Sequence, residues 1–201
     1  MTKIGIVCAM SKEVEKIITA YGLVQIDSHL DYKIYQKNHI TLIESNIGKV
    51  ASTLAVAILI DKFNIGRLIN IGLAGAINSL PAGSAYFVSS VTQHDAFIPF
   101  DDYQQDLYQS IDCYVPEHTN KSMVLTTGDQ FITNTSMINN NADMVDMEGF
   151  SVAYVANRYD IPVSLIKGIS DDANHSSEAE LFKNLNAAMD QTILLLKTII
   201  D

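Results

Sequence analysis

The feature that most constrains the fold of this chain is a repeated alternation between short β-branched apolar runs and longer segments with apolar side chains at helical spacing. Residues 3–9 form the first such run, and residues 12–21 follow it with a helical period. Strands that alternate with helices predict an α/β fold, here a three-layer α/β/α arrangement around a central mixed, mainly parallel sheet. At about 150 residues per domain, the chain of 201 residues is expected to form a single domain over residues 1–201.

The remainder of the chain continues this alternation. Residues 97–120 are the exception, because they show no clear period and therefore predict a long loop, a class that often carries function. Ser11 is the expected N-cap of the first helix. The further elements predicted are strands at 32–36, 40–45, 68–71, 84–92, 123–126, 144–146 and 163–169, and helices at 50–63, 148–159 and 177–200.

Charge and cysteine content exclude several classes of protein. The 23 acidic and 13 basic residues give a net charge of −10, which argues against a nucleic-acid partner, since phosphate binding needs clustered Lys and Arg. Arg67 and Arg158 are the only arginines, so the chain can build few bidentate sites for phosphate. Cys8 and Cys113 form no C-x-x-C pair, and no signal peptide or membrane span is predicted. We therefore expect a cytoplasmic protein without a membrane partner.

Three carboxylates fall at or just past predicted strand ends. Glu13 lies in the first turn of the first helix, Glu148 begins a later helix, and Asp171 follows the strand at 163–169. Ligands of α/β sheets bind at the carboxyl ends of strands, where converging carboxylates can divide acid, base and electrostatic roles. Taken singly, Glu13 and Glu148 are explained equally well by the preference of acidic residues for the first helical turn.

Other short motifs permit both a structural and a functional interpretation. The segment Gly72-Leu73-Ala74-Gly75 suits either close approach of the backbone to a ligand or tight packing behind a strand. His94-Asp95 is either a satisfied polar pair or part of a site. Met10, Phe131 and Met147 either line an apolar pocket or belong to the core. No motif predicts a metal ion or a cofactor, so neither is expected.

Taken in order, the motifs of the chain resemble one family. The chain is similar to the 5′-methylthioadenosine/S-adenosylhomocysteine nucleosidases of the purine nucleoside phosphorylase superfamily. The segments that carry the resemblance are Lys3-Ile4-Gly5-Ile6-Val7-Cys8-Ala9-Met10 with Glu13-Val14, Asn46-Ile47-Gly48-Lys49-Val50, Gly72-Leu73-Ala74-Gly75, His94-Asp95, Thr127-Gly128-Asp129-Gln130-Phe131-Ile132, Val145-Asp146-Met147-Glu148-Gly149 and Ile169-Ser170-Asp171-Asp172-Ala173.

The resemblance implies a division of labour for hydrolysis of an N-glycosidic bond. Asp171 would protonate the purine at N7, and Ser170 would help to orient the base. Glu148 would hold the ribose hydroxyls and stabilise positive charge in the transition state, with Met147 against the sugar. Glu13 would be the general base for the attacking water. The activity implied is release of adenine from a small nucleoside, as in methionine salvage.

The resemblance also implies the remaining contacts with substrate and a homodimer. Phe131 would stack on the adenine, the backbone of Ile132 would read its edge, and Met10 and Ile47 would contact the ribose and the 5′-thio group. A partner's loop would close the 5′ pocket. That loop corresponds here to residues 97–106, with Phe97 and Phe100 as the cross-subunit candidates.

Three departures from the family pattern leave alternatives open. Leu73 stands where a hydroxyl residue is usual, Lys167 replaces an arginine, and the segment 97–120 is short. Water is the expected nucleophile, because phosphate would need several clustered donors, and Lys167 is a candidate to orient that water. The alternatives are a nucleosidase or phosphorylase for another purine or futalosine-type nucleoside, and a nucleoside-binding protein without catalysis.

Overall fold

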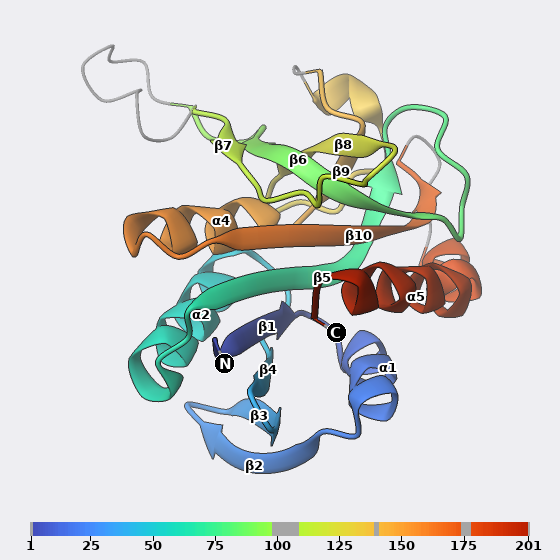
Figure 1. Ribbon diagram of the computed structural model, residues 1–201. Coiled ribbons are helices and arrows are strands. Elements are labelled where there is room, and N and C mark those ends of the chain that lie inside the picture. The colour runs from blue at the N-terminus through green and yellow to red at the C-terminus, as the bar shows by residue number, and fades with distance from the viewer. Residues whose placement is uncertain (1, 98–108, 139–140, 174–177, 201) are drawn as a thin grey trace.

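The apolar runs pair into one sheet of ten strands in the computed structural model, which describes residues 2–97, 109–138, 141–173 and 178–200 (Figure 1). The strands are β1 (Ile4–Cys8), β2 (Val24–His29), β3 (Tyr32–Lys37), β4 (Ile40–Glu44), β5 (Arg67–Ala76), β6 (Ala85–Gln93), β7 (Ile111–Asp112), β8 (Ser122–Thr127), β9 (Met144–Asp146) and β10 (Val163–Asp172). The helices are α1 (Ser11–Tyr21), α2 (Lys49–Phe63), α4 (Gly149–Arg158) and α5 (Glu178–Ile200), with a 3₁₀ turn η2 (Thr135–Met137).

The sheet is mixed, as predicted, and parallel pairing dominates its centre. Strands β4, β1, β5 and β10 are parallel neighbours, whereas the hairpins β2–β3 and β3–β4 extend one edge with antiparallel pairs. Strand β10 pairs with both β5 and β6, and β9 pairs with both β8 and β5. These double pairings close a ring of five strands, β10-β6-β8-β9-β5, which the strand pattern of the sequence does not predict.

Helices cover both faces of the sheet, which confirms the three-layer arrangement (Figure 1). Helices α2 and α4 pack together on one face, and their apolar side chains join a core cluster with β5, β8 and β10. Helices α1 and α5 pack together on the other face, over a second cluster that contains β1, β4 and β5. Burial of strands on both faces explains why they read as continuous apolar runs.

The structure corrects several element boundaries. Strand β5 continues to Ala76 and β10 to Asp172, so the Gly72-Leu73-Ala74-Gly75 motif and Asp171 lie within strands and not after them. The continued pairing of β5 with β10 explains this extension. Strand β2 was not predicted, because its polar residues obscure the alternation. Strand β7 lies inside the predicted loop, and residues 98–108 of that loop lie outside the described residues.

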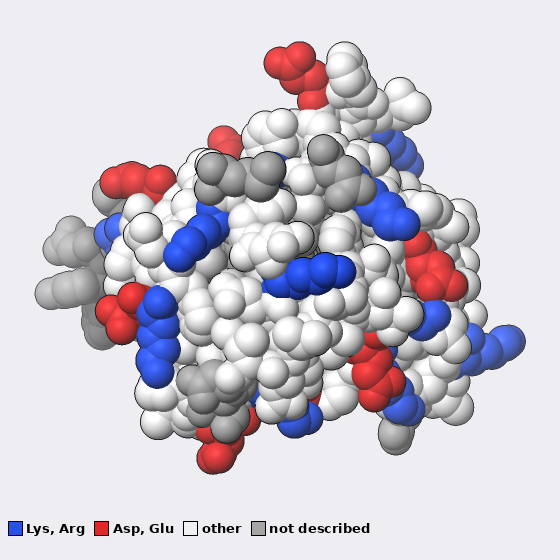
Figure 2. All heavy atoms as spheres, turned by 60° about the horizontal axis from the view of Figure 1, so that its bottom comes forward, with Lys and Arg blue, Asp and Glu red and all other residues white. Residues whose placement is uncertain are grey.

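The first helix begins at Ser11, but its N-cap is Met10 and not Ser11. The carboxylate of Glu13, in the first turn, accepts a hydrogen bond from the N–H of the N-cap residue Met10 (3.0 Å), as the glutamate of a capping box does. Among the described residues, no helix is long and apolar enough to cross a membrane. Figure 2 shows one face of the molecule, on which cationic and anionic side chains are interspersed with uncharged surface.

Candidate active site

A pocket lies at the carboxyl ends of the parallel strands. Nine of the ten candidate residues line it, namely Met10, Glu13, Ile47, Phe131, Ile132, Met147, Glu148, Ser170 and Asp171. The tenth, Lys167, is not among the lining residues. The pocket is completed by Ala9, Leu73, Ala74, Gly75, Gln130, Val145, Asp146 and Leu181. Its lining is therefore mostly apolar with a few converging carboxylates, which is typical of a small-molecule site.

A bulge in β10 brings two consecutive side chains into the pocket. The register between β10 and β5 shifts between Ile169 and Asp171, and Asp171 pairs with Gly75. Successive side chains of a regular strand point to opposite faces, but a bulge redirects one of them. Ser170 and Asp171 therefore both line the pocket. The Ser170 hydroxyl donates a short hydrogen bond to the Asp171 carboxylate, which fixes the orientation of that carboxylate.

Glu13 is held rigidly although it belongs to the first turn of α1. Its side chain is buried and accepts hydrogen bonds from the Met10 N–H (3.0 Å) and from the Leu73 N–H (2.8 Å). The Cys8 thiol also donates to Glu13, with a sulfur–oxygen distance of 3.6 Å. Glu13 therefore bonds the start of the helix and also lines the pocket.

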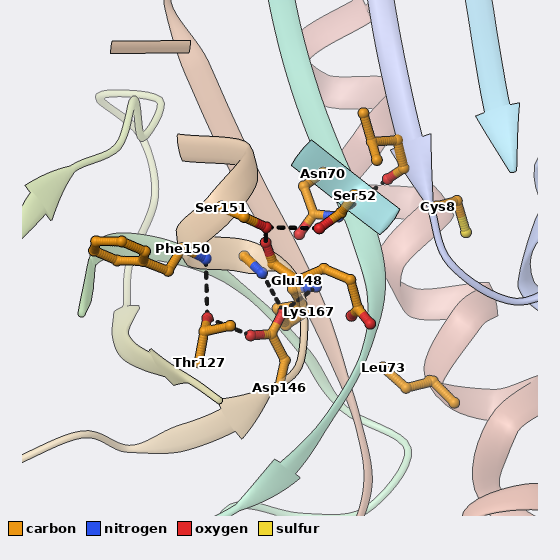
Figure 3. Close-up of polar contacts among 12 residues, drawn as sticks. Cys8, Ser52, Asn70, Leu73, Thr127, Asp146, Glu148, Phe150, Ser151 and Lys167 are labelled. Atoms are coloured by element: carbon orange, nitrogen blue, oxygen red, sulfur yellow. Dashed lines mark hydrogen bonds and ion pairs between the residues drawn. The ribbon is translucent and has the colours of Figure 1, made fainter. Parts of the chain in front are cut away.

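Glu148 is the N-cap of α4, so the predicted start of this helix is one residue early. Its carboxylate accepts a hydrogen bond from the Gly48 N–H at the start of α2 (2.9 Å). The backbone carbonyl of Glu148 accepts a hydrogen bond from the Ser151 hydroxyl (2.7 Å). The Ser151 hydroxyl in turn lies 2.6 Å from the Ser52 hydroxyl of α2 (Figure 3). Two helix N-termini therefore fix the position of the Glu148 carboxylate at the pocket wall.

Behind Glu148 lies a buried ion pair that the sequence did not predict. The Lys167 ammonium and an Asp146 oxygen are 2.7 Å apart, and each side chain is only 1% exposed. Asp146 also accepts a hydrogen bond from the Thr127 hydroxyl (2.6 Å), as Figure 3 shows. It accepts a further one from the Gly149 N–H (2.8 Å). Lys167 therefore neutralises Asp146 instead of facing the pocket, and the geometry gives no support to its predicted contact with substrate or water. In the sequence, the one sign of a role for Asp146 was its position at the end of a predicted strand.

Burial and crowding of carboxylates set the proton affinities in the site. Burial, followed by repulsion from Asp146, raises the pKa of Glu148 to about 8, although Lys167 and the Gly48 N–H oppose the shift. Burial also raises the pKa of Glu13, against the hydrogen bonds from Met10 and Leu73. Raised values bring carboxyl groups toward neutral pH, where they exchange protons most effectively. The arrangement is therefore suited to acid–base chemistry on a small ligand.

The glycines of the Gly72-Leu73-Ala74-Gly75 motif make room for two of these carboxylates. A Cβ atom at Gly72 would lie 3.2 Å from Glu13 Oε1, and one at Gly75 would lie 3.3 Å from Asp171 Oδ2. The motif therefore permits close approach of carboxylates to the backbone. The Leu73 side chain faces the pocket between them.

The other predicted positions are the two cross-subunit phenylalanines and the His94-Asp95 pair. The Phe97 side chain is 80% exposed, whereas Phe100 lies outside the residues that the structure describes. Asp95 is not among the lining residues of the pocket, and it pairs with Lys49 at 2.6 Å. His94 is half-buried, and burial lowers its pKa.

Comparison with known proteins gives consistent matches over nearly the whole chain. A family model described as the phosphorylase superfamily matches residues 3–201. An aminodeoxyfutalosine nucleosidase of Campylobacter jejuni is 29% identical, with 89% of each chain covered. A 5′-methylthioadenosine/S-adenosylhomocysteine nucleosidase of Shewanella denitrificans is 28% identical, with 89% of this chain and 90% of the relative covered.

Solved structures agree in fold. A 5′-methylthioadenosine/S-adenosylhomocysteine nucleosidase of Helicobacter pylori superposes with a TM-score of 0.86 at 24% identity, covering 100% of this chain and 98% of the other. A 5′-methylthioadenosine nucleosidase of Arabidopsis thaliana superposes with a TM-score of 0.88 at 23% identity, covering 100% and 96%. The whole described architecture is therefore shared with these enzymes.

Proposed function

Since the chain belongs to the phosphorylase superfamily, we propose that it is a purine nucleosidase that hydrolyses the N-glycosidic bond of 5′-methylthioadenosine, S-adenosylhomocysteine or both. One observation carries this proposal: Glu13, Glu148 and Asp171, from three separate parts of the chain, line one mostly apolar pocket. Relatives that bear this activity in their names align over most of the chain. The products would be adenine and a 5-substituted ribose.

The three carboxylates take different roles in the proposed reaction. Asp171, oriented by Ser170, donates a proton to N7 of the purine, which makes the base a better leaving group. The N-glycosidic bond then breaks, and its electron pair leaves with adenine. Glu148 holds the ribose hydroxyls and, in its ionised form, stabilises the positive charge that develops on the sugar. Glu13 takes the proton of the water that forms the new bond to C1′.

The apolar residues of the pocket provide contacts for the uncharged parts of such a substrate. Phe131, about half exposed at the rim, is proposed to stack on the purine, and the Ile132 backbone to bond its edge. Met10, Ile47 and Met147 are proposed to contact the ribose and the 5′ group. Their thioether and branched side chains suit a sulfur-containing, weakly polar substituent.

Water, and not phosphate, is the proposed nucleophile. Among the described residues that line the pocket, none is Lys or Arg, while several are carboxylates. Lys167 is committed to Asp146 at 2.7 Å. Arg67 donates to the Ile199 carbonyl and Arg158 to the Tyr154 hydroxyl, and neither lines the pocket. A dianion would therefore meet repulsion without compensating donors.

An adenine-release assay with methylthioadenosine tests this function. We expect release at equal rates with and without phosphate, and a near-total loss in Asp171→Asn with the thermal unfolding transition retained. Dependence on phosphate would reject hydrolysis, and an unchanged rate in Asp171→Asn would reject the acid assignment. Tight nucleoside binding without any turnover would instead indicate a binding protein.

A second candidate substrate is aminodeoxyfutalosine. The relatives from Campylobacter jejuni and Helicobacter pylori that carry this activity in their names are as similar to this chain as the methylthioadenosine enzymes. A substrate panel separates the two, because a kcat/KM that favours a nucleoside without sulfur would reject methylthioadenosine as the principal substrate.

We also propose a homodimer in which residues 97–106 complete the partner's pocket, and a cytoplasmic location. The dimer is supported by large apolar side chains left exposed near the pocket, with Val50 at 84% and Phe97 at 80%. Light scattering of the wild type and of Val50→Glu tests the assembly. A monomeric wild type would reject it. The free thiols of Cys8 and Cys113 suit a reducing compartment, and cell fractionation tests that location.

A further inference from the structure

Three segments that border the pocket are tied together by a closed ring of polar contacts. The Lys49 N–H donates to Asp129 Oδ1 (2.9 Å), and the Asp129 N–H donates to Asp95 Oδ2 (2.8 Å). The Lys49 ammonium closes the ring on Asp95 Oδ1 at 2.6 Å. These residues come from the start of α2, the segment after β6 and the segment after β8, so the ring joins parts of the chain far apart in sequence.

We propose that Lys49, Asp95 and Asp129 form a positioning ring that fixes both Glu148 and Phe131 for the reaction. The inference rests on the proposed nucleosidase function, because it assigns further residues to the same site. None of the three lines the pocket. Lys49 adjoins Gly48, which bonds Glu148, and Asp129 adjoins Gln130, which lines the pocket. Asp95 bonds both Lys49 and Asp129.

The link to Glu148 runs through Gly48, the residue before Lys49. Its N–H donates to the Glu148 carboxylate at 2.9 Å, and its φ of 101° is one that favours glycine. This conformation depends on where the next peptide is held. Asp129 accepts the N–H of that next peptide, so the ring fixes the donor that orients Glu148.

The link to the purine side runs along the segment after β8. Asp129 is followed by three residues that line the pocket, namely Gln130, Phe131 and Ile132. The Asp129 N–H is anchored to Asp95, and its carboxylate is anchored to α2. A two-sided anchor immediately before Phe131 sets the position of its ring at the rim.

The number of its partners distinguishes the ring from an isolated surface ion pair. The side chains of Lys49, Asp95 and Asp129 are 20%, 25% and 49% exposed, and Lys49 has further partners in Gln93 Oε1 (3.2 Å) and Asp129 Oδ2 (3.7 Å). Burial raises the pKa of Asp95, but the Lys49 ammonium and the Asp129 N–H outweigh this effect and lower it overall. Asp95 is therefore ionised in the folded protein at neutral pH.

The test compares Lys49→Met, Asp95→Asn and the double variant with the wild type. Lys49→Arg is the conservative rescue, and Lys16→Met is the matched control, because Lys16 pairs with Asp190 on an exposed surface away from the pocket. The measurements are kcat and KM for methylthioadenosine, the Kd of adenine by calorimetry, and the Tm. Asp95→Asn keeps an oxygen for the Asp129 N–H, so it is the variant that best preserves folding.

We expect Lys49→Met to lower kcat/KM by about 10- to 100-fold, the loss typical of a misplaced catalytic group. Both kcat and the Kd of adenine should change, because the ring serves Glu148 and Phe131. The kcat/KM of the double variant should lie within about twofold of that of the less active single variant, since the effects of substitutions at interacting residues do not add. Lys49→Arg should recover most activity, and Lys16→Met should retain all of it.

The proposal would be overturned if Lys49→Met and Asp95→Asn both retained the kcat and KM of the wild type. It would also fail if activity fell only in proportion to unfolding at the assay temperature, or if Lys16→Met caused an equal loss. An inactive wild type would reject the proposed function instead. In that case the ring would be judged by adenine affinity, and an unchanged Kd in both variants would overturn it.

Discussion

Replacing Lys167 by methionine tests how the buried charges of the site are balanced. The variant removes an ammonium that lies 2.7 Å from Asp146, with each side chain 1% exposed, and keeps nearly the same volume. Asp146 would retain its hydrogen bonds from Thr127 and Gly149 but lose its counter-ion. An uncompensated buried charge of this kind costs about 3–5 kcal/mol of unfolding free energy.

The corresponding shift is large enough for a simple assay. At about 2–4 °C per kcal/mol for a chain of this size, the Tm of Lys167→Met should fall by roughly 6–20 °C. In the wild type, burial lowers the pKa of Lys167, but Asp146 and Glu148 outweigh it and raise the pKa overall. The stabilisation by Lys167 is therefore complete at neutral pH and is lost only as the pH rises through that raised pKa.

Two further variants separate charge from packing. Asp146→Asn combined with Lys167→Met removes both charges and keeps one amide oxygen as acceptor for the Gly149 N–H, while the amide NH2 faces the Thr127 hydroxyl oxygen. This double variant should recover most of the lost stability. Lys16→Met breaks an exposed pair and should change the unfolding free energy by less than about 0.5 kcal/mol. A Tm of Lys167→Met within 2 °C of the wild type, roughly 1 kcal/mol or less, would refute the reasoning that Asp146 depends on Lys167 as its counter-ion.

Three other changes have definite expected outcomes. The pKa of Glu148 in the folded protein is about 8, above its unfolded value, so ionisation of Glu148 destabilises the fold as the pH rises. Glu148→Gln should therefore have a higher Tm than the wild type at pH 9. The same variant should lose adenine release. Gly48→Ala should lower kcat/KM at least about tenfold, since a φ of 101° strains an alanine and its Cβ would lie 3.3 Å from Asp129 Oδ1; unchanged kinetics would contradict the role of the Gly48 N–H. Gly72→Ala should lower kcat more than it raises KM, because its Cβ would crowd Glu13, which acts on water and not on the nucleoside; steady-state kinetics decide this.

The sequence indicated which carboxylates line one pocket better than it predicted the boundaries of the elements. Glu13, Glu148 and Asp171 were identified because strand ends of a parallel sheet converge, whatever the exact length of each strand. Boundaries failed where pairing between distant segments decided them, as when β5 and β10 extended each other to Ala76 and Asp172. The sequence could not identify the partner of Lys167 for a related reason, since only the fold brings its ammonium within 2.7 Å of Asp146.

What the sequence by itself determined is the part encoded in local periods: the alternation of strands and helices, the α/β class, and the carboxylates at the strand ends. What only the tertiary structure decided is which side chains meet. The bulge that turns both Ser170 and Asp171 into the pocket, the ion pair behind Glu148 and the ring of Lys49, Asp95 and Asp129 all join separate segments. Periodicity fixes the face on which a side chain lies, but not the register of one strand against another, and that register sets every one of these contacts.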